Sequence, residues 1–535
     1  MILINLMKIK NNSLKTFFYP LLAIFAFYVN FYYGNLGLHP IDTFTFFDTG
    51  FNITIGKHPI KDTWIISGIF GDYLQALFFK LFGFNWNSYL YHSSTLNALV
   101  SLIFFIYLKK IGLKDIESFL FAISLSILCY PVAGTPFTYI HSYLFSLISI
   151  MMFVLSVFCK KRIFFFLLPI SMFISFLSMQ LPSGIINIIL IISFLIFYIN
   201  SKKNIQIIYY FLLGTFFSLF LFIFYLLYLE IPFKDFLIQY VLFPLALGSE
   251  RIASTNEAFE SAKLINKLNF KSIVLDFKFI HLFLFSHLVL IFFQKKFYKK
   301  NREFLIIDLT IIISSFAFIF HQLITANQIF IFSQIPFVSA LLYLRMTRIF
   351  KDKNFIKFFF TFVLLLFTSK YHLEFNEKRK FMDLQNVDLN NYIQASNLDN
   401  KFNNLKWITP EYKVNPLEEI KYLKEAIKLL KTEKREKMVI TNYQFFSLIL
   451  NEDLNILNRW YYPDNTFPWR PNHLYYEEYK KFFNNKIKKE KIEVIIIVMS
   501  SPDAYLKKYL EYLNSNCTYK KVNELTTFFY LKNCM

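Results

Sequence analysis

Long apolar runs recur through the first 372 residues of this 535-residue chain. A helix that crosses the roughly 30 Å hydrocarbon core of a bilayer needs about 17–25 consecutive, mostly apolar residues. Many of the apolar runs reach this length, and the chain is 56% hydrophobic, above the roughly 45–50% typical of soluble domains. We therefore predict a polytopic α-helical membrane protein with spans at about 17–37, 88–108, 116–133, 139–158, 163–179, 184–199, 206–228, 274–293, 304–320, 326–344 and 355–372.

The basic residues set the expected orientation of these spans. A net charge of +21 would suit a nucleic-acid-binding protein, but the Lys and Arg residues gather in short connections between apolar runs. Such clusters mark the cytoplasmic side of a membrane protein. They fall on the side of the N-terminus: Lys109, Lys110 and Lys114; Lys160, Lys161 and Arg162; Lys202 and Lys203; Lys295, Lys296, Lys299, Lys300 and Arg302; Arg345, Arg348, Lys351 and Lys353. We expect a cytoplasmic N-terminus and no nucleic-acid partner. The richness in Lys, Ile, Asn and Phe favours an AT-rich bacterial genome, and hence a bacterial plasma membrane.

This orientation places three segments outside: the loops 38–87 and 229–272 and the region 373–535. Residues 1–372, with both loops, are expected to form the membrane domain. The region 373–535 is more polar, and its pattern predicts a small external α/β domain. Its expected helices are Pro416–Lys437 and Ala504–Leu513, and its expected strands are Met438–Thr441, Val494–Met499, Thr518–Asn523 and Thr527–Leu531. An oxidising exterior would allow a disulfide between Cys517 and Cys534.

The loop between the first two spans carries four aspartates, Asp42, Asp48, Asp62 and Asp72. A carboxyl group held near an apolar surface has a raised pKa and can act as a general base. The alternative is that these acids are solvated or cap short helices. The aromatic residues of the loop predict that it lies on the membrane surface. They include Phe44, Phe46, Phe47, Phe51 and Trp64.

Two short motifs resemble a known family. They are D-T-G-x-x-x-x-x-G-K-H-P-I-K-D-T-W-x-x-x-G at Asp48–Gly68 and S-M-Q-L-P-S-G at Ser178–Gly184. The first resembles the first external loop of GT-C class membrane glycosyltransferases, especially the bacterial relatives of protein O-mannosyltransferases and aminoarabinose transferases. The second is similar to the Lys-Gln…Gly element of these relatives, with Met179 in place of Lys. The expected topology, with about eleven spans and an external C-terminal domain, is also similar to theirs.

The resemblance implies a transferase that moves a sugar from a polyprenyl-phosphate donor to a lipid, glycan or protein acceptor on the external face, with inversion. An aspartate of the first loop would deprotonate the acceptor hydroxyl. We favour Asp48 as this base and expect Asp62 and Asp72 to order the loop or bind the acceptor. The family often has a neighbouring acidic pair where this chain has Asp48 alone, so the other loop aspartates stay open as the base.

The leaving group of such a reaction is a lipid phosphate, whose developing charge is stabilised by positive and polar groups. The candidate substrate-binding and phosphate-binding residues are Asp42, Lys57, His58, Lys61, Gln180 and Arg251. For each lysine, contact with lipid headgroups is the competing interpretation. No cofactor is required, and no His, Cys and Asp cluster has the spacing of a metal site. Paired acids are nevertheless able to bind Mg²⁺ or Mn²⁺.

Two other function classes compete with this interpretation. A lipid-linked polysaccharide polymerase or ligase uses similar donors, but usually depends on a large later external loop with Arg and His. Here the 229–272 loop has one Arg, Arg251, and no His. A transporter of lipid-linked sugars often has inverted repeats and broken helices in both halves, and the sequence shows neither clearly.

Overall fold

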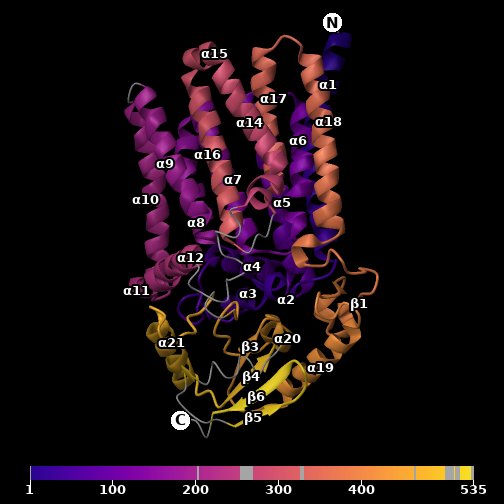
Figure 1. Ribbon diagram of the computed structural model, residues 1–535, viewed down its shortest axis with the longest axis vertical. Coiled ribbons are helices and arrows are strands. Elements are labelled where there is room, and N and C mark those ends of the chain that lie inside the picture. Colours follow the sequence, from indigo (N-terminus) through magenta and orange to yellow (C-terminus); the bar gives the residue numbers. More distant parts are fainter. Residues whose placement is uncertain are drawn as a thin grey trace.

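The computed structural model of the chain describes residues 2–201, 204–253, 269–325, 330–462, 466–500, 511–512 and 518–531. Figure 1 shows a bundle of long helices and, below it, a small sheet with helices of its own. The N-terminus and the sheet lie at opposite ends of the bundle (Figure 1). The basic helix α15 (Lys295–Lys300) lies at the N-terminal end, where the charge pattern predicts it. Which end faces the cytoplasm stays a prediction.

Apolar helices build the bundle, and eight described stretches are long and apolar enough to cross a membrane. They are Phe17–Gly34 in α1 (Ile2–Gly34), α5 (Trp86–Ile111), Asp115–Val132 with α6 (Asp115–Leu128) and the turn η1 (Tyr130–Val132), α7 (Thr138–Cys159), α9 (Ser183–Asn200), α10 (Ile205–Tyr228), α16 (Arg302–Ile324), and Lys353–Met382 with α18 (Lys353–Tyr371). Three shorter helices lie at the remaining predicted spans: α8 (Arg162–Ser178), α14 (Lys278–Phe293) and α17 (Gln334–Ile349). The chain is a polytopic helical protein, and the count of eleven spans stays a prediction.

Burial differs strongly among these helices. The rest of the protein buries 83% of the apolar stretch of α7 but only 17% of that of α10. On α10 the exposed side chains are large and apolar, with Phe216 and Phe220 about two thirds exposed. Exposing such side chains to water is unfavourable, so the outer face of α10 fits a hydrocarbon environment. The helix α7 instead forms the centre of the bundle.

The loop between the first two predicted spans, called the first loop below, folds into three short helices, α2 (Pro40–Thr43), α3 (Phe47–Thr54) and α4 (Ile69–Phe82). The prediction that its aromatic side chains lie on the membrane surface is wrong, because Phe44, Phe46 and Phe47 are fully buried inside the protein. The Phe47 ring stacks on Phe402 with 5.7 Å between centroids, and Phe44 lies 6.2 Å from Trp407. Packing against the C-terminal region removes the same apolar surface from water as a bilayer would, and sequence alone does not distinguish the two.

The 229–272 loop also packs onto the first loop. Its described part forms α11 (Phe233–Phe236), the π-helical turn η2 (Leu237–Leu242), α12 (Phe243–Ala253) and, at its end, the π-helical turn η4 (Lys271–Leu275). Figure 1 places α11 and α12 at the sheet end of the bundle. The buried Gln239 side chain donates to the carbonyl oxygen of Ile60 at 3.0 Å and accepts from the amide of Ile65 at 3.1 Å.

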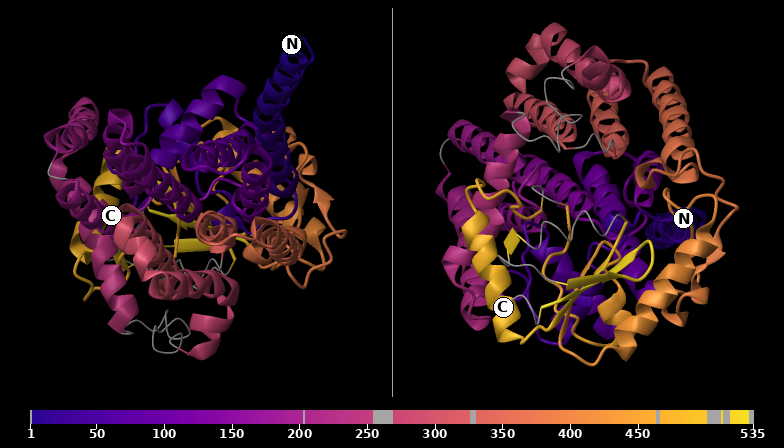
Figure 2. Two further views of the ribbon diagram at one scale, coloured as in Figure 1. Left: turned by 90° about the horizontal axis from the view of Figure 1, so that it is seen from above. Right: turned by 60° about the horizontal axis from the view of Figure 1, so that its bottom comes forward.

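The region after α18 contains a four-stranded sheet in the order β3-β4-β6-β5. Its strands are β3 (Lys437–Thr441), β4 (Val494–Val498), β5 (Thr518–Lys521) and β6 (Thr526–Tyr530), and only the β3–β4 pair is parallel. The accompanying helices are α19 (Pro416–Thr432), α20 (Phe446–Leu450) and α21 (Tyr476–Lys489). These elements confirm the predicted helix at 416–437 and all four predicted strands. Figure 2 shows α19 and α21 flanking the sheet. That this region is a separate external domain stays a prediction.

Short elements link the bundle to this sheet. They are the π-helical turn η6 (His372–Glu377), the turns η7 (Lys380–Met382), η8 (Ala395–Asn397) and η9 (Asn400–Phe402), and the strand pair β1 (Ile393–Gln394) and β2 (Lys406–Trp407). The further turn η5 (Ile331–Ser333) lies within the bundle, between α16 and α17. The backbone around β2 pairs with the end of α1: the amide of Lys406 donates to Asn35, and the amide of Leu38 donates to Ile408. The expected helix Ala504–Leu513 lies largely, and Cys517 and Cys534 entirely, outside the described residues.

Candidate functional site at the junction of bundle and sheet

The four aspartates of the first loop lie in different environments. Asp48 and Asp72 have no exposed surface, Asp62 is 7% exposed, and the Asp42 side chain is 21% exposed. The first loop lies between the ends of the bundle helices and the sheet (Figure 1). These acids are neighbours in one loop of the sequence, but in the structure they differ in their bonding partners and in their exposure to solvent.

Asp48 is bound to the C-terminal region. Its two carboxylate oxygens accept hydrogen bonds from the amides of Ser447 (3.2 Å) and Leu448 (3.0 Å), at the start of α20. Its own amide donates to the carbonyl oxygen of Gln444 at 3.0 Å. Burial raises the pKa of Asp48 to about 7, and the backbone amides limit that rise. The pKa suits a general base, but both oxygens are engaged and the side chain is closed off from solvent.

Asp72 forms a buried ion pair with Arg459, and its other oxygen accepts from the Thr49 hydroxyl at 2.6 Å. Burial raises the pKa of Asp72 to about 6, and Arg459 and Thr49 hold it from rising further. Arg459 also donates to the carbonyl oxygen of Ser67 and lies 4.9 Å from the centroid of the Phe46 ring. This contact ties the first loop to the C-terminal region across 387 residues of sequence.

Gly68 makes room for that ion pair. Its φ of +79° lies in the left-handed region that glycine adopts without strain. A Cβ at this position would lie 2.5 Å from Nη1 of Arg459 and 2.5 Å from Cγ2 of Thr138. The glycine at the end of the Asp48–Gly68 motif therefore permits the approach of the arginine.

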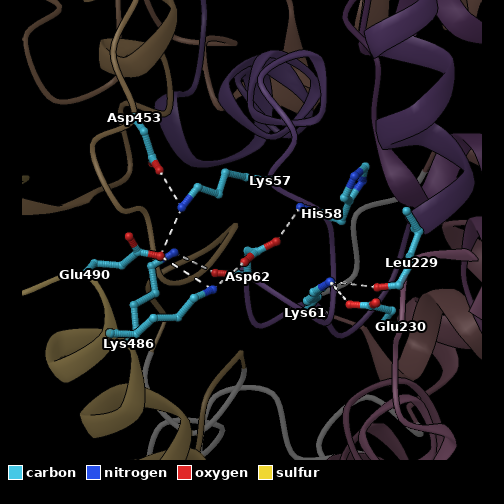
Figure 3. Close-up of polar contacts among 10 residues, drawn as sticks. Lys57, His58, Lys61, Asp62, Leu229, Glu230, Asp453, Lys486 and Glu490 are labelled. Carbon is cyan, nitrogen blue, oxygen red and sulfur yellow. Dashed lines mark hydrogen bonds and ion pairs between the residues drawn. The ribbon is translucent and has the colours of Figure 1, made fainter.

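Asp62 belongs to a charged network between the first loop and α21 (Figure 3). Its carboxylate accepts from the amide of His58 at 2.9 Å, and its carbonyl oxygen accepts from the buried Lys486 ammonium at 2.7 Å. Lys57 forms ion pairs with Asp453 (3.1 Å) and Glu490 (3.0 Å), as Figure 3 shows. Burial lowers the pKa of Lys486 to about 8. Lys57, which the sequence predicts to bind phosphate, is thus paired with two carboxylates of the protein itself.

The turn between these residues is strained. Ile60 has a φ of +73°, which is a genuine outlier for a β-branched residue. Its amide donates to the carbonyl oxygen of Thr63 at 2.9 Å, and Gln239 holds its carbonyl oxygen. Such strain costs about 1–3 kcal/mol and persists where the surroundings fix the chain. The GKHPIKD segment is therefore held rigidly by neighbours on both sides.

Three other residues predicted to bind substrate or phosphate, Lys61, His58 and Gln180, contact neighbouring parts of the first loop and of the 229–272 loop. Lys61 pairs with Glu230 at 3.3 Å and donates to the carbonyl oxygen of Leu229 at 2.9 Å (Figure 3). The His58 ring lies 3.0 Å from the Tyr73 hydroxyl. Gln180 donates to the carbonyl oxygens of Ile66 (2.8 Å) and Tyr240, so it connects three segments. Arg251 lies in α12, and its side chain is outside the part of the chain that the structure describes.

Asp42 is the accessible acid of the loop. It lies in α2, and its carboxylate is 3.5 Å from Nδ1 of His39, which is 28% exposed. Burial would lower the pKa of His39, but the neighbouring acids Asp42, Asp383 and Glu411 raise it overall. Asp42 and His39 therefore form a carboxylate–imidazole pair that reaches the surface.

The carboxyl ends of β3 and β4 point to this part of the loop. Gln444, just after β3, accepts from the amide of Asp48, and Ser500, just after β4, donates to the Glu411 carboxylate. Glu411 is in turn one of the acids that act on His39. In open α/β sheets, ligands bind beyond the carboxyl ends of parallel strands. The accessible acid pair thus lies next to the edge of the sheet that favours a ligand.

The acids of the first loop are the candidates for a metal site. Among the described residues, no group of three or more His, Cys, Asp or Glu side chains is arranged to hold a metal ion. Asp48 and Asp72, the most buried acids of the loop, already have backbone amides, a hydroxyl and a guanidinium as partners. These two carboxylates are therefore engaged by the protein itself, and binding of Mg²⁺ or Mn²⁺ by the loop acids stays a prediction.

No protein-family model matches this chain, and no curated protein matches it. The resemblance to the GT-C family therefore rests on the two motifs and the expected topology, and it stays a hypothesis.

Sequence reasoning missed the partners that organise this region. Arg459, Asp383 and Glu411 come from segments that no local pattern links to the first loop. His39 carried a usable signal, because residues three apart in a short helix lie on one face. Its position before Asp42 would have predicted the pair.

Proposed function

We propose that this protein is a membrane glycosyltransferase that takes a sugar from a polyprenyl-phosphate donor, with Asp42 as the general base. The observation that supports this choice is the exposure of the Asp42 side chain to solvent. Asp42 is the most exposed of the four loop aspartates and has an imidazole beside it, whereas Asp48 and Asp72 are closed off by their partners. The proposal moves the base from Asp48 to Asp42 and keeps the substrate class that the motif implies.

In the proposed reaction Asp42 removes the proton of an acceptor hydroxyl. The acceptor oxygen forms a bond to the anomeric carbon while the bond from that carbon to the phosphate oxygen breaks. The electron pair leaves with the polyprenyl phosphate, the proton stays on Asp42, and the configuration at the anomeric carbon inverts. The His39 imidazole, with Nδ1 3.5 Å from the Asp42 carboxylate, would hold that carboxylate in position before the transfer.

The other loop acids take positioning roles in this proposal. Asp48 and Asp72 fix the loop to α20 and Arg459, which sets the direction from which Asp42 meets a substrate. The network around Asp62 and Lys57 fixes the far end of the loop to α21 (Figure 3). A base is effective only when its position is held, and these contacts supply that rigidity.

Transfer from radiolabelled polyprenyl-phosphate sugars, in membranes that contain the wild type or Asp42→Asn, tests the proposal. We expect transfer by the wild type with an inverted anomeric configuration, and a loss of about 100-fold or more in Asp42→Asn, as removal of a general base typically gives. Asp388→Asn is the matched control, since Asp388 is an exposed acid of the C-terminal region. Absence of transfer from every donor by a correctly inserted wild type, or full activity of Asp42→Asn, would overturn it.

A further inference from the structure

An open cavity of about 340 Å³ lies where α18 ends, and its lining contains neither Asp42 nor His39. Its lining includes three lysines, Lys370, Lys378 and Lys380, together with Glu374 and Leu373. The stretch Lys353–Met382, which supplies most of this lining, is one of the eight membrane-crossing candidates. The cavity therefore lies at the sheet end of a helix that faces the bilayer.

The charge of the cavity is positive and only partly balanced. Glu374 forms an ion pair with Lys380 at 2.6 Å. Within the described part of the chain, Lys370 and Lys378 have no carboxylate partner. Two ammonium groups thus remain available to an anion that enters the cavity.

An apolar stripe leads along α18 to these lysines. Phe358, Phe362 and Leu366 are 72%, 57% and 49% exposed, and they recur every four residues, which is the spacing of one helix face. Lys370 is the next position of the stripe, and its ammonium lies 4.7 Å from the centroid of the Phe279 ring. Long basic side chains at the end of a membrane helix lay their stems on apolar surface and direct the charge toward the headgroups. Figure 1 shows α18 at the outside of the bundle.

We propose that this cavity binds the phosphate headgroup of an anionic bilayer phospholipid, whose acyl chains lie on the apolar stripe of α18. The lysines match a phosphate, and the stripe matches hydrocarbon, so the two features together select a lipid rather than a free anion. The stripe faces outward, where bilayer phospholipid is the available ligand. This site is independent of the proposed transferase activity, because its lining contains none of the residues of the Asp42 site.

The test measures retained lipid on the full-length protein, purified in neutral detergent, by native mass spectrometry. The probes are phosphatidylglycerol and phosphatidylcholine with identical acyl chains, polyprenyl phosphate, and inorganic phosphate. The variants are Lys370→Gln with Lys378→Gln, the charge-conserving Lys370→Arg with Lys378→Arg, and the control Lys421→Gln with Lys424→Gln on the exposed face of α19. All substituted residues are exposed, so the fold should tolerate these changes.

We expect the wild type to retain phosphatidylglycerol in preference to phosphatidylcholine. The Gln variant should bind phosphatidylglycerol about 10- to 30-fold more weakly, since each lysine near an anionic surface contributes on the order of a few-fold to tenfold. The Arg variant and the α19 control should keep the preference. Equal retention of both phospholipids, or a Gln variant that keeps the preference, would overturn the proposal. Preferential retention of polyprenyl phosphate would also overturn it. Retention of inorganic phosphate equal to that of phosphatidylglycerol would do the same.

Discussion

Arg459 and Asp72 form a buried ion pair that joins the C-terminal region to the first loop. Both side chains are shielded from solvent, and Arg459 also donates to Ser67 and contacts the Phe46 ring. The loop that carries the candidate base is therefore positioned by a residue 387 positions away, not by its own sequence.

Removal of Arg459 should destabilise the protein strongly. Arg459→Leu leaves the Asp72 carboxylate buried without its charge partner, which typically costs about 3–5 kcal/mol. Lys521→Leu is the control, because Lys521 pairs with Glu524 at an exposed site and such pairs contribute about 0–1 kcal/mol. Thermal unfolding in detergent measures both. Equal effects of the two substitutions would contradict the assigned role of the Arg459–Asp72 pair.

A methyl group at Gly68 should disturb the same contact. Gly68→Ala places a Cβ 2.5 Å from Nη1 of Arg459, and overpacking of this kind typically costs about 1–3 kcal/mol. Gly56→Ala is a matched control, since Gly56 also has a positive φ, of +85°, but has nothing within 4 Å of its would-be Cβ. Both variants carry the backbone strain, so the difference in melting temperature isolates the contact. Indistinguishable melting temperatures would show that the space at Gly68 is not needed.

Asp48 should make stability depend on pH. Its pKa is about 7 in the folded protein, against about 3.9 for an unperturbed aspartate. Between about pH 4 and pH 7 the folded state holds more protons at this site than the unfolded chain, so stability falls as the pH rises through that range. Asp48→Asn removes this component. Its melting temperature relative to the wild type should therefore increase from about pH 5 to about pH 8.

Ser447→Ala is the control for this measurement. It changes a side chain next to the same contact without adding or removing a titrating group, so its offset from the wild type should be the same at both pH values. A pH-independent offset for Asp48→Asn as well would contradict the raised pKa of Asp48.

The ion network between the first loop and α21 should contribute modestly to the stability of the folded protein. Lys57 is 23% exposed and meets two carboxylates, so Lys57→Met should lower the stability by about 1 kcal/mol and make it less sensitive to salt. Lys61→Met should change the stability by less than about 0.5 kcal/mol, because its partner Glu230 is 84% exposed. Unfolding at low and high ionic strength checks both. A larger loss of stability in Lys61→Met than in Lys57→Met would contradict this ranking of the two lysines.

Local patterns predicted much of the fold. Apolar run length predicted the membrane helices, and the spacing of Leu and Ile predicted α19. The buried strands β3 and β4 were recognisable as short runs of Val, Ile and Met. Each of these signals depends on residues within one element, which is why sequence alone carries it.

The candidate site was predictable only in part. The loop and its four acids were found, but Phe44 and Phe47 were assigned to the membrane surface because their burial partners, Phe402 and Trp407, are distant in sequence. The motif resemblance favoured Asp48 as the base, and nothing local in the sequence corrected it. Its closure by the amides of α20 depends on tertiary packing across about 400 residues, and no local pattern reports it.

In the proposed reaction Asp42, and not Asp48, accepts the proton of the acceptor hydroxyl. The most direct measurement compares sugar transfer from a polyprenyl-phosphate donor by Asp42→Asn and Asp48→Asn, each stably inserted in membranes, at one pH near 7. We expect a loss of about 100-fold or more for Asp42→Asn and less than about tenfold for Asp48→Asn. Full activity in Asp42→Asn together with loss in a folded Asp48→Asn would contradict it and return the base to the buried carboxylate.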